Sequence, residues 1–206
     1  MRIKICGITN QEDAQLCSRL GADALGFVFY DKSERNIDPV SAENIIAGLS
    51  PFIMKIGVFV DKSPEEINFI SKQAGLNAVQ VYENASQYFI DKIVPPVIKC
   101  FRIKKEFDFS LIDKYKNCSF LLDTYVHNIH GGTGETFEWN KIPDLVRPNI
   151  ILAGGISEKN IEYVFKEIKP AGVDLSSSIE LFPGKKSEEK LKRFFGLFNN
   201  LRGKYE

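Results

Sequence analysis

The stretch MKIGVFVDKSPEE, residues 54–66, contains a transition from a strand to a helix. Its first seven residues are an almost continuous apolar run, which is typical of a strand buried on both faces of a parallel sheet. Ser63 and Glu66 then fit the S-x-x-E capping box, and Pro64 occupies the first helical position. The stretch therefore predicts a buried strand that runs directly into a capped helix.

The same pattern recurs along the chain. Helical stretches alternate with apolar runs, and the residues from Thr9 to Glu12 fit a second capping box, while Ser157 precedes another amphipathic run. Eight repeats of about 25 residues each account for the whole chain. The eight runs that read as strands are IKIC, ALGFVFY, MKIGVFV, AVQVY, VIKCFRI, SFLLDT, NIILAGG and AGVDLSS.

We therefore predict an α/β fold, a single (β/α)8 TIM barrel that occupies residues 1–206 as one domain. An open doubly wound sheet is the alternative, but the GxGxxG fingerprint of its dinucleotide-binding form is absent after the first strand. The last stretch, SEEKLKRFFGLFNNLRG, is expected to be a docking helix with acidic residues in its first turn. Its buried face should consist of Leu191, Phe194, Phe195, Phe198 and Leu201.

Charge and composition argue against several classes of function. The chain has 27 basic and 27 acidic residues, so no basic excess favours a nucleic-acid partner. No segment approaches the roughly 20 apolar residues of a membrane span, and the N-terminus MRIKICGITNQ lacks the apolar region of a signal peptide. We expect a cytoplasmic protein with a small-molecule ligand, no nucleic acid and no membrane contact, either a monomer or a homodimer.

The cysteines and histidines do not favour a metal site. The four cysteines are far apart and form no CxxC pair, which argues against both a zinc site and a redox motif. His127 and His130 are three residues apart in HNIHGGTG, but exposed loop histidines are commoner than metal ligands. We therefore predict no metal and no other cofactor, with free thiols at Cys6, Cys17, Cys100 and Cys118.

In a (β/α)8 barrel, catalytic residues lie at the C-terminal ends of the strands and in the loops that follow. A cysteine at such a strand end, followed by Gly7, is placed to face a ligand rather than the packed core. Polar or unusual residues gather at these positions, namely Cys6, Ser33, Arg35, Asp61, Asp123, Gly154, Gly155, Asp174, Ser176 and Ser177.

The ends of the seventh and eighth predicted strands, LAGGIS and VDLSSSIE, favour a phosphate site. Barrels commonly bind phosphate there through glycine amides and the N-terminus of a short extra helix. Gly154 and Gly155 alone are weak evidence, because a glycine pair also makes a plain turn. Together with Ser176 and Ser177 at the neighbouring strand, the pattern predicts a phosphorylated small-molecule substrate.

Three further features have two interpretations each. Asp123 ends the apolar run FLLD, where burial would raise its pKa and suit it to act as a general acid; otherwise it caps a helix or makes a turn. The stretch GGTGETFEW is either a lid over the ligand or a plain surface loop. Arg35 either grips a planar carboxylate with a bidentate fork or lies solvated on the surface.

Together these motifs resemble one known family, the phosphoribosylanthranilate isomerases. The match runs from Arg2 to Lys185 and rests on KICGIT, GFVF followed by S-x-R, LLDT with GGTG-x-x-F-x-W, LAGGI, and VDLSS with IE and PG. Members are (β/α)8 barrels that convert N-(5′-phosphoribosyl)anthranilate to 1-(o-carboxyphenylamino)-1-deoxyribulose 5-phosphate in tryptophan biosynthesis. The resemblance implies this Amadori rearrangement, without metal or organic cofactor.

The resemblance also implies roles for single residues. Asp123 would protonate the furanose ring oxygen as general acid, and Cys6 would remove the C2′ proton as general base. An ordinary thiol pKa near 8.5 would need a downward shift, for which the strand-end amides are a candidate source. Arg35 is expected to meet the anthranilate carboxylate, and Asp174 to hold either Arg35 or the amino side of the ligand. The phosphate-binding segments correspond to Gly154, Gly155, Ser176 and Ser177.

The sequence departs from the family pattern at three places. It has QVYEN where relatives have QLHG, so Tyr82 replaces a histidine, and it has KK where KD usually follows PG. Ser178 stands at a glycine position and would restrict the phosphate loop if that position needs a positive φ. The alternatives are an isomerase of another aminated sugar phosphate and a non-catalytic binder of a phosphoribosyl ligand. The presence of both Cys6 and Asp123 argues against the binder.

Overall fold

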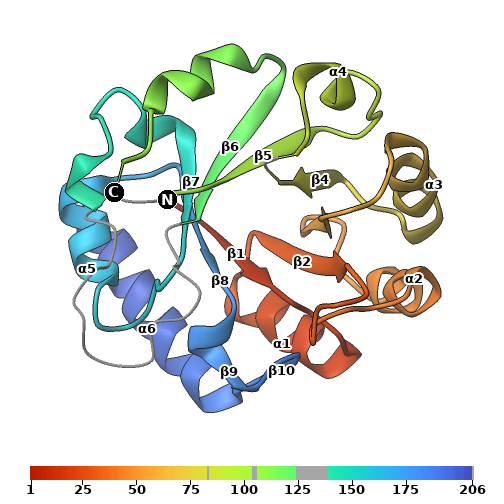
Figure 1. The fold of residues 1–206 in the computed structure, drawn as a ribbon. Coiled ribbons are helices and arrows are strands. Elements are labelled where there is room, and N and C mark those ends of the chain that lie inside the picture. Colours follow the sequence, from red (N-terminus) through yellow and green to blue (C-terminus); the bar gives the residue numbers. More distant parts are fainter. Residues whose placement is uncertain (83, 104–105, 124–138, 206) are drawn as a thin grey trace.

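A computed structural model describes residues 1–82, 84–103, 106–123 and 139–205 (Figure 1). Parallel strands form a closed barrel in which each strand pairs with its neighbours in the sequence, and β8 closes the ring by pairing with β1. The predicted (β/α)8 barrel is therefore confirmed. Its strands are β1 (Arg2–Cys6), β2 (Ala24–Phe29), β3 (Met54–Phe59), β4 (Ala78–Val81), β5 (Val97–Arg102), β6 (Cys118–Asp123), β7 (Ile150–Ala153) and β8 (Gly172–Leu175).

The outer layer is less regular than eight equal repeats would give. A six-residue 3-10 helix, η1, follows β5, and α5 is a single turn that continues as the π-helix η4. A short hairpin of β9 (Glu180–Phe182) and β10 (Lys185–Lys186) follows β8. The helices are α1 (Gln11–Leu20), α2 (Pro39–Ala47), α3 (Pro64–Ala74), α4 (Gln87–Ile90), η1 (Phe109–Lys114), η2 (Trp139–Lys141), η3 (Arg147–Asn149), α5 (Ile161–Tyr163), η4 (Val164–Ile168), η5 (Ser177–Ile179) and α6 (Glu188–Tyr205).

One of the three predicted helix starts is confirmed. At α3, the Ser63 hydroxyl accepts a hydrogen bond from the amide of Glu66, and the Glu66 carboxylate accepts one from the amide of Ser63. The capping box predicted from Thr9 is wrong, because Asn10 caps α1 and the Thr9 hydroxyl donates to the carbonyl of Gly184. This bond ties the loop after β1 to the β9–β10 hairpin.

The helix predicted to begin after Ser157 begins later. A turn comes first, in which the side chain of Asn160 accepts a hydrogen bond from the amide of Ser157 and donates one to the carbonyl of Gly155. Helix α5 then starts at Ile161. The loop after β7 is therefore longer than the sequence pattern predicts.

Two apolar clusters lie on opposite faces of the strands, because successive side chains of a strand alternate between faces. The larger cluster fills the space between barrel and helices, and it includes the five residues predicted to form the buried face of α6. The smaller cluster lies inside the barrel and consists of Ala24, Ile56, Ala78, Ile98, Cys100, Leu121 and Ala153, with Tyr82 and Ile151 packed against it.

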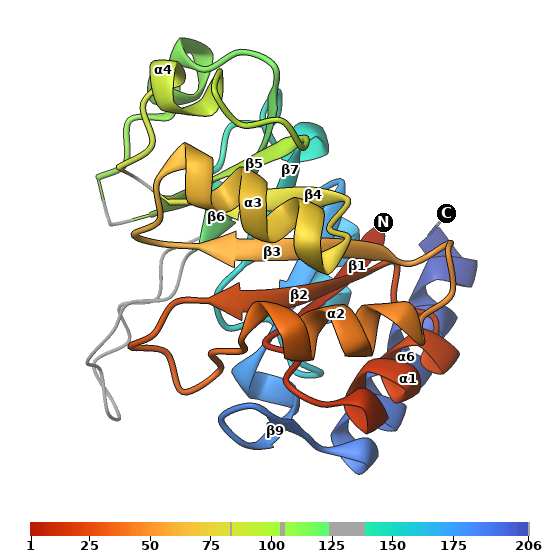
Figure 2. The ribbon, with the colours of Figure 1, turned by 90° about the vertical axis from the view of Figure 1, so that its right-hand side faces the viewer.

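The arrowheads of β2 and β3 point away from both chain termini, which lie close together at the opposite end of the barrel (Figure 2). Helices α2 and α3 pack against each other outside β2 and β3, and α6 packs against α1. The C-terminal strand ends, where the site residues are predicted, thus share one face of the molecule. Among the described residues, no helix has the length and apolar character needed to cross a membrane.

Candidate active site

A group of polar side chains lies inside the barrel, where apolar packing would be expected. Lys4 is only 3% exposed, and its ammonium nitrogen is 2.6 Å from Asp174 Oδ2 and 3.1 Å from Gln80 Oε1. These residues come from β1, β8 and β4, so the contact spans the barrel. The second carboxylate oxygen of Asp174 is buried and has no hydrogen-bond partner among the described residues. It is therefore available to a ligand.

Cys6 ends β1 above this group, and two glycines make room for it. A Cβ atom at Gly26 would lie 2.8 Å from the Cys6 sulfur, which shows how closely the thiol approaches β2. Gly7 has a φ of +79°, and a Cβ there would lie 2.6 Å from Cδ of Arg35 and 3.3 Å from the Ser176 hydroxyl. The segment after β1 therefore brings Cys6, Arg35 and Ser176 close together.

Two lysines near Cys6 oppose the effect of its burial on the thiol pKa. Burial raises the pKa of the Cys6 thiol, whereas the positive charges of Lys4 and Lys186 lower it and the carboxylate of Asp174 raises it. Net, the thiol pKa lies above its ordinary value. The influences that favour the thiolate thus come from two lysines, which the sequence did not identify, rather than from the strand-end amides proposed as their source.

Arg35 is held by a carboxylate of the protein. Its Nε lies 3.0 Å and its Nη2 lies 2.6 Å from the two oxygens of Glu180, a bidentate arrangement. Glu180 also accepts a hydrogen bond of 2.7 Å from Lys186, whose ammonium donates to the carbonyl of Cys6. Burial would raise the pKa of Glu180, but hydrogen bonds from Arg35 and Lys186 hold it below its usual range. Arg35 is therefore not a freely solvated side chain.

Asp123 ends β6, which β7 and β8 separate from β1 in the barrel. It is partly buried, and its carbonyl accepts a hydrogen bond of 2.8 Å from the amide of Ile103. Burial raises the pKa of Tyr82, and the charges of Cys6, Asp123 and Asp174 raise it further. Tyr82 thus faces the same interior space as these three residues, with its hydroxyl 3.4 Å from the Gln80 amide nitrogen.

The predicted phosphate segments lie next to each other after β7 and β8. Gly154 and Gly155 have φ angles of +85° and +74°, a backbone conformation that favours glycine. The short helix η5 begins at Ser177, so the first amides of this turn have no intrahelical acceptor. The hydroxyl of Ser176 is buried without a partner among the described residues. The predicted short extra helix is thus present.

Ser178 does not restrict this loop. Positive φ angles at described residues other than glycine occur at Asn117 and Lys169, so Ser178 lies in the region that any residue adopts. The restriction expected from a serine at this family glycine position therefore does not arise.

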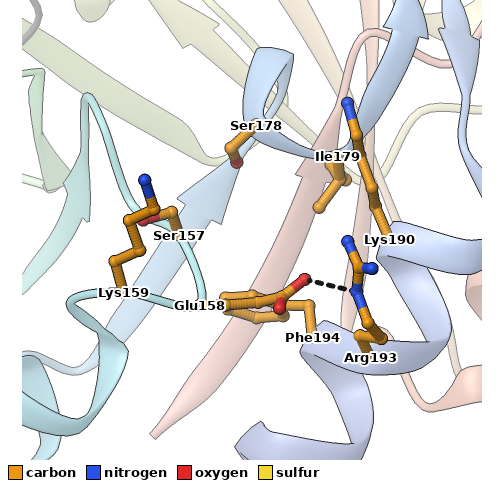
Figure 3. A pocket seen from close by; sticks show the side chains of 8 residues that line it. All are labelled: Ser157, Glu158, Lys159, Ser178, Ile179, Lys190, Arg193 and Phe194. Atoms are coloured by element: carbon orange, nitrogen blue, oxygen red, sulfur yellow. Dashed lines mark hydrogen bonds and ion pairs between the residues drawn. The ribbon is translucent and has the colours of Figure 1, made fainter.

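A pocket lies beside these loops, between the segment after β7 and helix α6 (Figure 3). Ser157 and Ser178 line it, together with Lys190 and Arg193 of α6. Arg193 is paired with Glu158 across the pocket at 3.3 Å. None of the four residues predicted to bind phosphate lines this pocket, so it is separate from the strand-end site.

Several predictions concern residues outside the described ranges. These include the glycine-rich loop from Gly131 to Glu138 and the two histidines, His127 and His130.

The four cysteines are free thiols, as predicted. The sequence reasoning missed Lys4, Gln80, Glu180 and Lys186. For Lys4 a signal was present, because a residue two positions before Cys6 on one strand shares its face.

The fold and these strand-end groups define a (β/α)8-barrel enzyme with a partly buried thiol and carboxylates facing an interior site. The family model "N-(5′-phosphoribosyl)anthranilate (PRA) isomerase" matches residues 3–196, and the chain belongs to this family. An isomerase of that name from Pelobacter propionicus is 40% identical over 203 residues, which are 98% of this chain and 97% of the relative.

Solved structures of the family superpose on nearly the whole chain. Phosphoribosyl anthranilate isomerase from Thermotoga maritima has 39% sequence identity and a TM-score of 0.88, with 98% of this chain and 99% of that chain covered. A second structure holds reduced 1-(o-carboxyphenylamino)-1-deoxyribulose 5-phosphate. Its identity is 36% and its TM-score 0.83, with 98% and 99% of the chains covered.

Proposed function

We propose that this chain isomerises N-(5′-phosphoribosyl)anthranilate to 1-(o-carboxyphenylamino)-1-deoxyribulose 5-phosphate, a step of tryptophan biosynthesis. The observation that carries the proposal is the position of Cys6, Asp123 and Asp174 at or next to the C-terminal ends of β1, β6 and β8, on one face of the parallel barrel. The family match over residues 3–196 supports the same reaction. The reaction needs one proton donor and one proton acceptor near the sugar, and these side chains can supply both.

Asp123 acts as the general acid in the first step. Its carboxyl proton moves to the furanose ring oxygen while the bond from that oxygen to C1′ breaks. The lone pair of the anthranilate nitrogen then forms the C1′–N double bond of a protonated Schiff base. A partly buried carboxyl suits this role, because desolvation favours the protonated form.

Cys6 acts as the general base in the second step. Its thiolate takes the C2′ proton, the electron pair of that bond forms a double bond between C1′ and C2′, and the nitrogen regains its lone pair. The resulting enolamine tautomerises to the ketone at C2′. Because burial raises the pKa of Cys6, the step depends on the nearby positive charges that favour the thiolate.

The remaining site residues bind and orient the substrate. Arg35 receives the anthranilate carboxylate, with Glu180 fixing its guanidinium. Asp174 accepts a hydrogen bond from the anthranilate nitrogen through its unpartnered oxygen. The phosphate is bound at the loops after β7 and β8 by Gly154, Gly155, Ser176 and Ser177.

A fluorescence assay with freshly prepared phosphoribosylanthranilate tests the proposal. The wild type should consume the fluorescent substrate and give a product of unchanged mass, as an isomerisation requires. Asp123→Asn should abolish turnover yet still bind a reduced product analogue. Tight analogue binding without turnover by the wild type would favour a non-catalytic binder, and turnover of other aminated sugar phosphates alone would favour a different isomerase.

Assembly and location are part of the proposal. We expect a cytoplasmic protein. It should be a monomer or a homodimer, because a solved structure from Thermotoga maritima shows monomers of a dimeric isomerase of this family. Light scattering after size exclusion distinguishes the two states by mass.

A further inference from the structure

Lys4 is an unusual residue for the interior of a barrel. Burying an ammonium group is costly, and an ion pair inside a protein is often no more stable than apolar residues of similar volume. Packing alone therefore does not require a lysine here. The surrounding cluster of Ala24, Ile56 and Ala78 shows that apolar side chains fill neighbouring interior positions.

The ammonium group of Lys4 lies close to two of the proposed site residues, Asp174 and Cys6. Asp174 and Gln80 accept two of its three N–H donors, at 2.6 Å and 3.1 Å. Cys6 is two residues away on β1, so both side chains point to the same face of the strand. Lys4 thus contacts the carboxylate of Asp174 and shares one face of β1 with the thiol of Cys6.

We propose that Lys4 is a positioning residue for this reaction, which stabilises the Cys6 thiolate and the ionised form of Asp174 and leaves one Asp174 oxygen free for the ligand. The inference rests on the proposed function, in which Cys6 removes the C2′ proton. Burial alone would lower the pKa of Lys4, but Asp174 and Cys6 raise it above its ordinary value, so Lys4 stays charged. A permanent charge at this position favours the thiolate throughout the neutral range.

Other titratable and charged groups of the described residues also lie near Cys6. Most of them are already paired: Arg35 binds Glu180, and Lys186 is shared between Glu180 and the carbonyl of Cys6. Lys4 exerts the largest attractive influence on the thiolate. Among the described residues, Lys4 from β1, Asp174 from β8 and Lys186 from β10 act on Cys6, and Cys6 acts in turn on Arg35 after β2 and Tyr82 after β4. One contact further away, Cys100 from β5 and Asp123 from β6 act on Tyr82, and Glu180 from β9 pairs with Lys186.

The test measures the thiol pKa directly, without substrate. Cys6 is alkylated with iodoacetamide across a pH series, and the modified peptide is quantified by mass spectrometry. In Lys4→Met the midpoint of alkylation should rise by about 1 pH unit or more relative to the wild type. In Lys4→Arg, which keeps the charge, it should stay within about half a unit.

Lys99→Met is the matched control. Lys99 is equally buried on β5, but its ammonium donates to the carbonyls of Tyr82 and Ala85. The control should leave the alkylation midpoint of Cys6 unchanged. If Lys4→Met fails to fold, the double variant Lys4→Met with Asp174→Asn removes both charges, and its midpoint should still exceed that of the wild type.

The outcomes separate this inference from the proposed function. An unchanged midpoint in folded Lys4→Met, or an equal rise in Lys99→Met, would overturn the role of Lys4 and leave the isomerase proposal standing. Normal turnover by Cys6→Ala would instead overturn the proposed base, and with it the catalytic meaning of any midpoint shift.

Discussion

Lys4 and Lys99 are both buried on strands of the same barrel, yet they do different things. Lys4 points into the barrel, where it pairs with Asp174 beside Cys6. Lys99 points to the outer layer, where its ammonium lies 2.7 Å from the carbonyl of Tyr82 and 5.0 Å from the ring centre of Tyr115. The inner lysine supplies a positive charge to the site, whereas the outer one donates hydrogen bonds to the loop after β4. The side of the strand, and not burial, separates the two roles.

The largest expected effect follows from removing the acid on the inner side. In Asp123→Asn, kcat should fall by about 10²- to 10⁴-fold, because no group protonates the ring oxygen. Binding of a reduced product analogue, measured by calorimetry, should change little. Asp113→Asn, at an exposed carboxyl on η1, is the control and should keep normal kcat. Equal losses in both variants would remove Asp123 from the chemistry.

Replacing each of the two lysines by methionine should change a different property of the protein, kcat for Lys4 and stability for Lys99. Lys4→Met should lower kcat about tenfold or more at neutral pH, because a thiol pKa one unit higher leaves a tenth of the thiolate. Lys99→Met should keep kcat but lose about 2 kcal/mol of unfolding free energy, since two carbonyls lose their donor. Steady-state kinetics and urea unfolding of both proteins check this, and a large kcat loss in Lys99→Met would break the comparison.

Arg35 should affect substrate binding more than chemistry. Arg35→Met should raise KM about tenfold with a smaller change in kcat, because a charge-assisted contact to the substrate carboxylate is lost. Arg19→Met, in the last turn of α1, is a matched control on the surface. A KM equal to that of the wild type in Arg35→Met would place the anthranilate carboxylate elsewhere.

Cys17 is a buried thiol of the outer layer, and its ionisation should affect stability. Burial raises its pKa to about 12. The unfolded thiol ionises near pH 8.5, so the free energy of unfolding should fall by about 1.4 kcal/mol per pH unit above that pH, up to the folded pKa. Urea unfolding between pH 8.5 and 10.5 should show a shallower fall in Cys17→Ala. Parallel curves for the two proteins would contradict this.

The smallest expected effect lies far from both lysines, at the start of α3. Ser63→Ala removes one half of the capping box and should cost about 1 kcal/mol of unfolding free energy, with unchanged kcat and KM. Thermal and urea unfolding measure the loss. A change in kcat would mean that the outer layer influences the site more than the comparison allows.

The fold was predictable because its signals are local. Each strand is a short apolar run, and the face of α6 follows from the spacing of Leu191 and Phe198. Helix starts were less predictable, since the Thr9 hydroxyl is used by a tertiary contact with Gly184 that no local pattern encodes. The irregular helix η1 was missed for a different reason, because the polar segment between β5 and β6 has little periodicity.

The candidate site was predictable where a residue stands at a strand end, as for Cys6, Asp123 and Asp174. It was not predictable where function depends on contacts between distant segments. The pairing of Arg35 with Glu180 joins residues 145 positions apart, and that of Lys4 with Asp174 joins residues 170 apart. A lysine within an apolar run gives no sign from sequence that a carboxylate lies beside it on β8, the strand that closes the barrel against β1.

The most direct test of the account is the turnover of phosphoribosylanthranilate by Cys6→Ala and Cys118→Ala, prepared and assayed side by side with the wild type. Cys118 begins β6 and is also a free thiol, but it lies at the opposite end of its strand from Asp123. We expect Cys6→Ala to lose turnover while Cys118→Ala and the wild type keep it. Turnover near the wild-type rate in Cys6→Ala would contradict the assignment of the catalytic base.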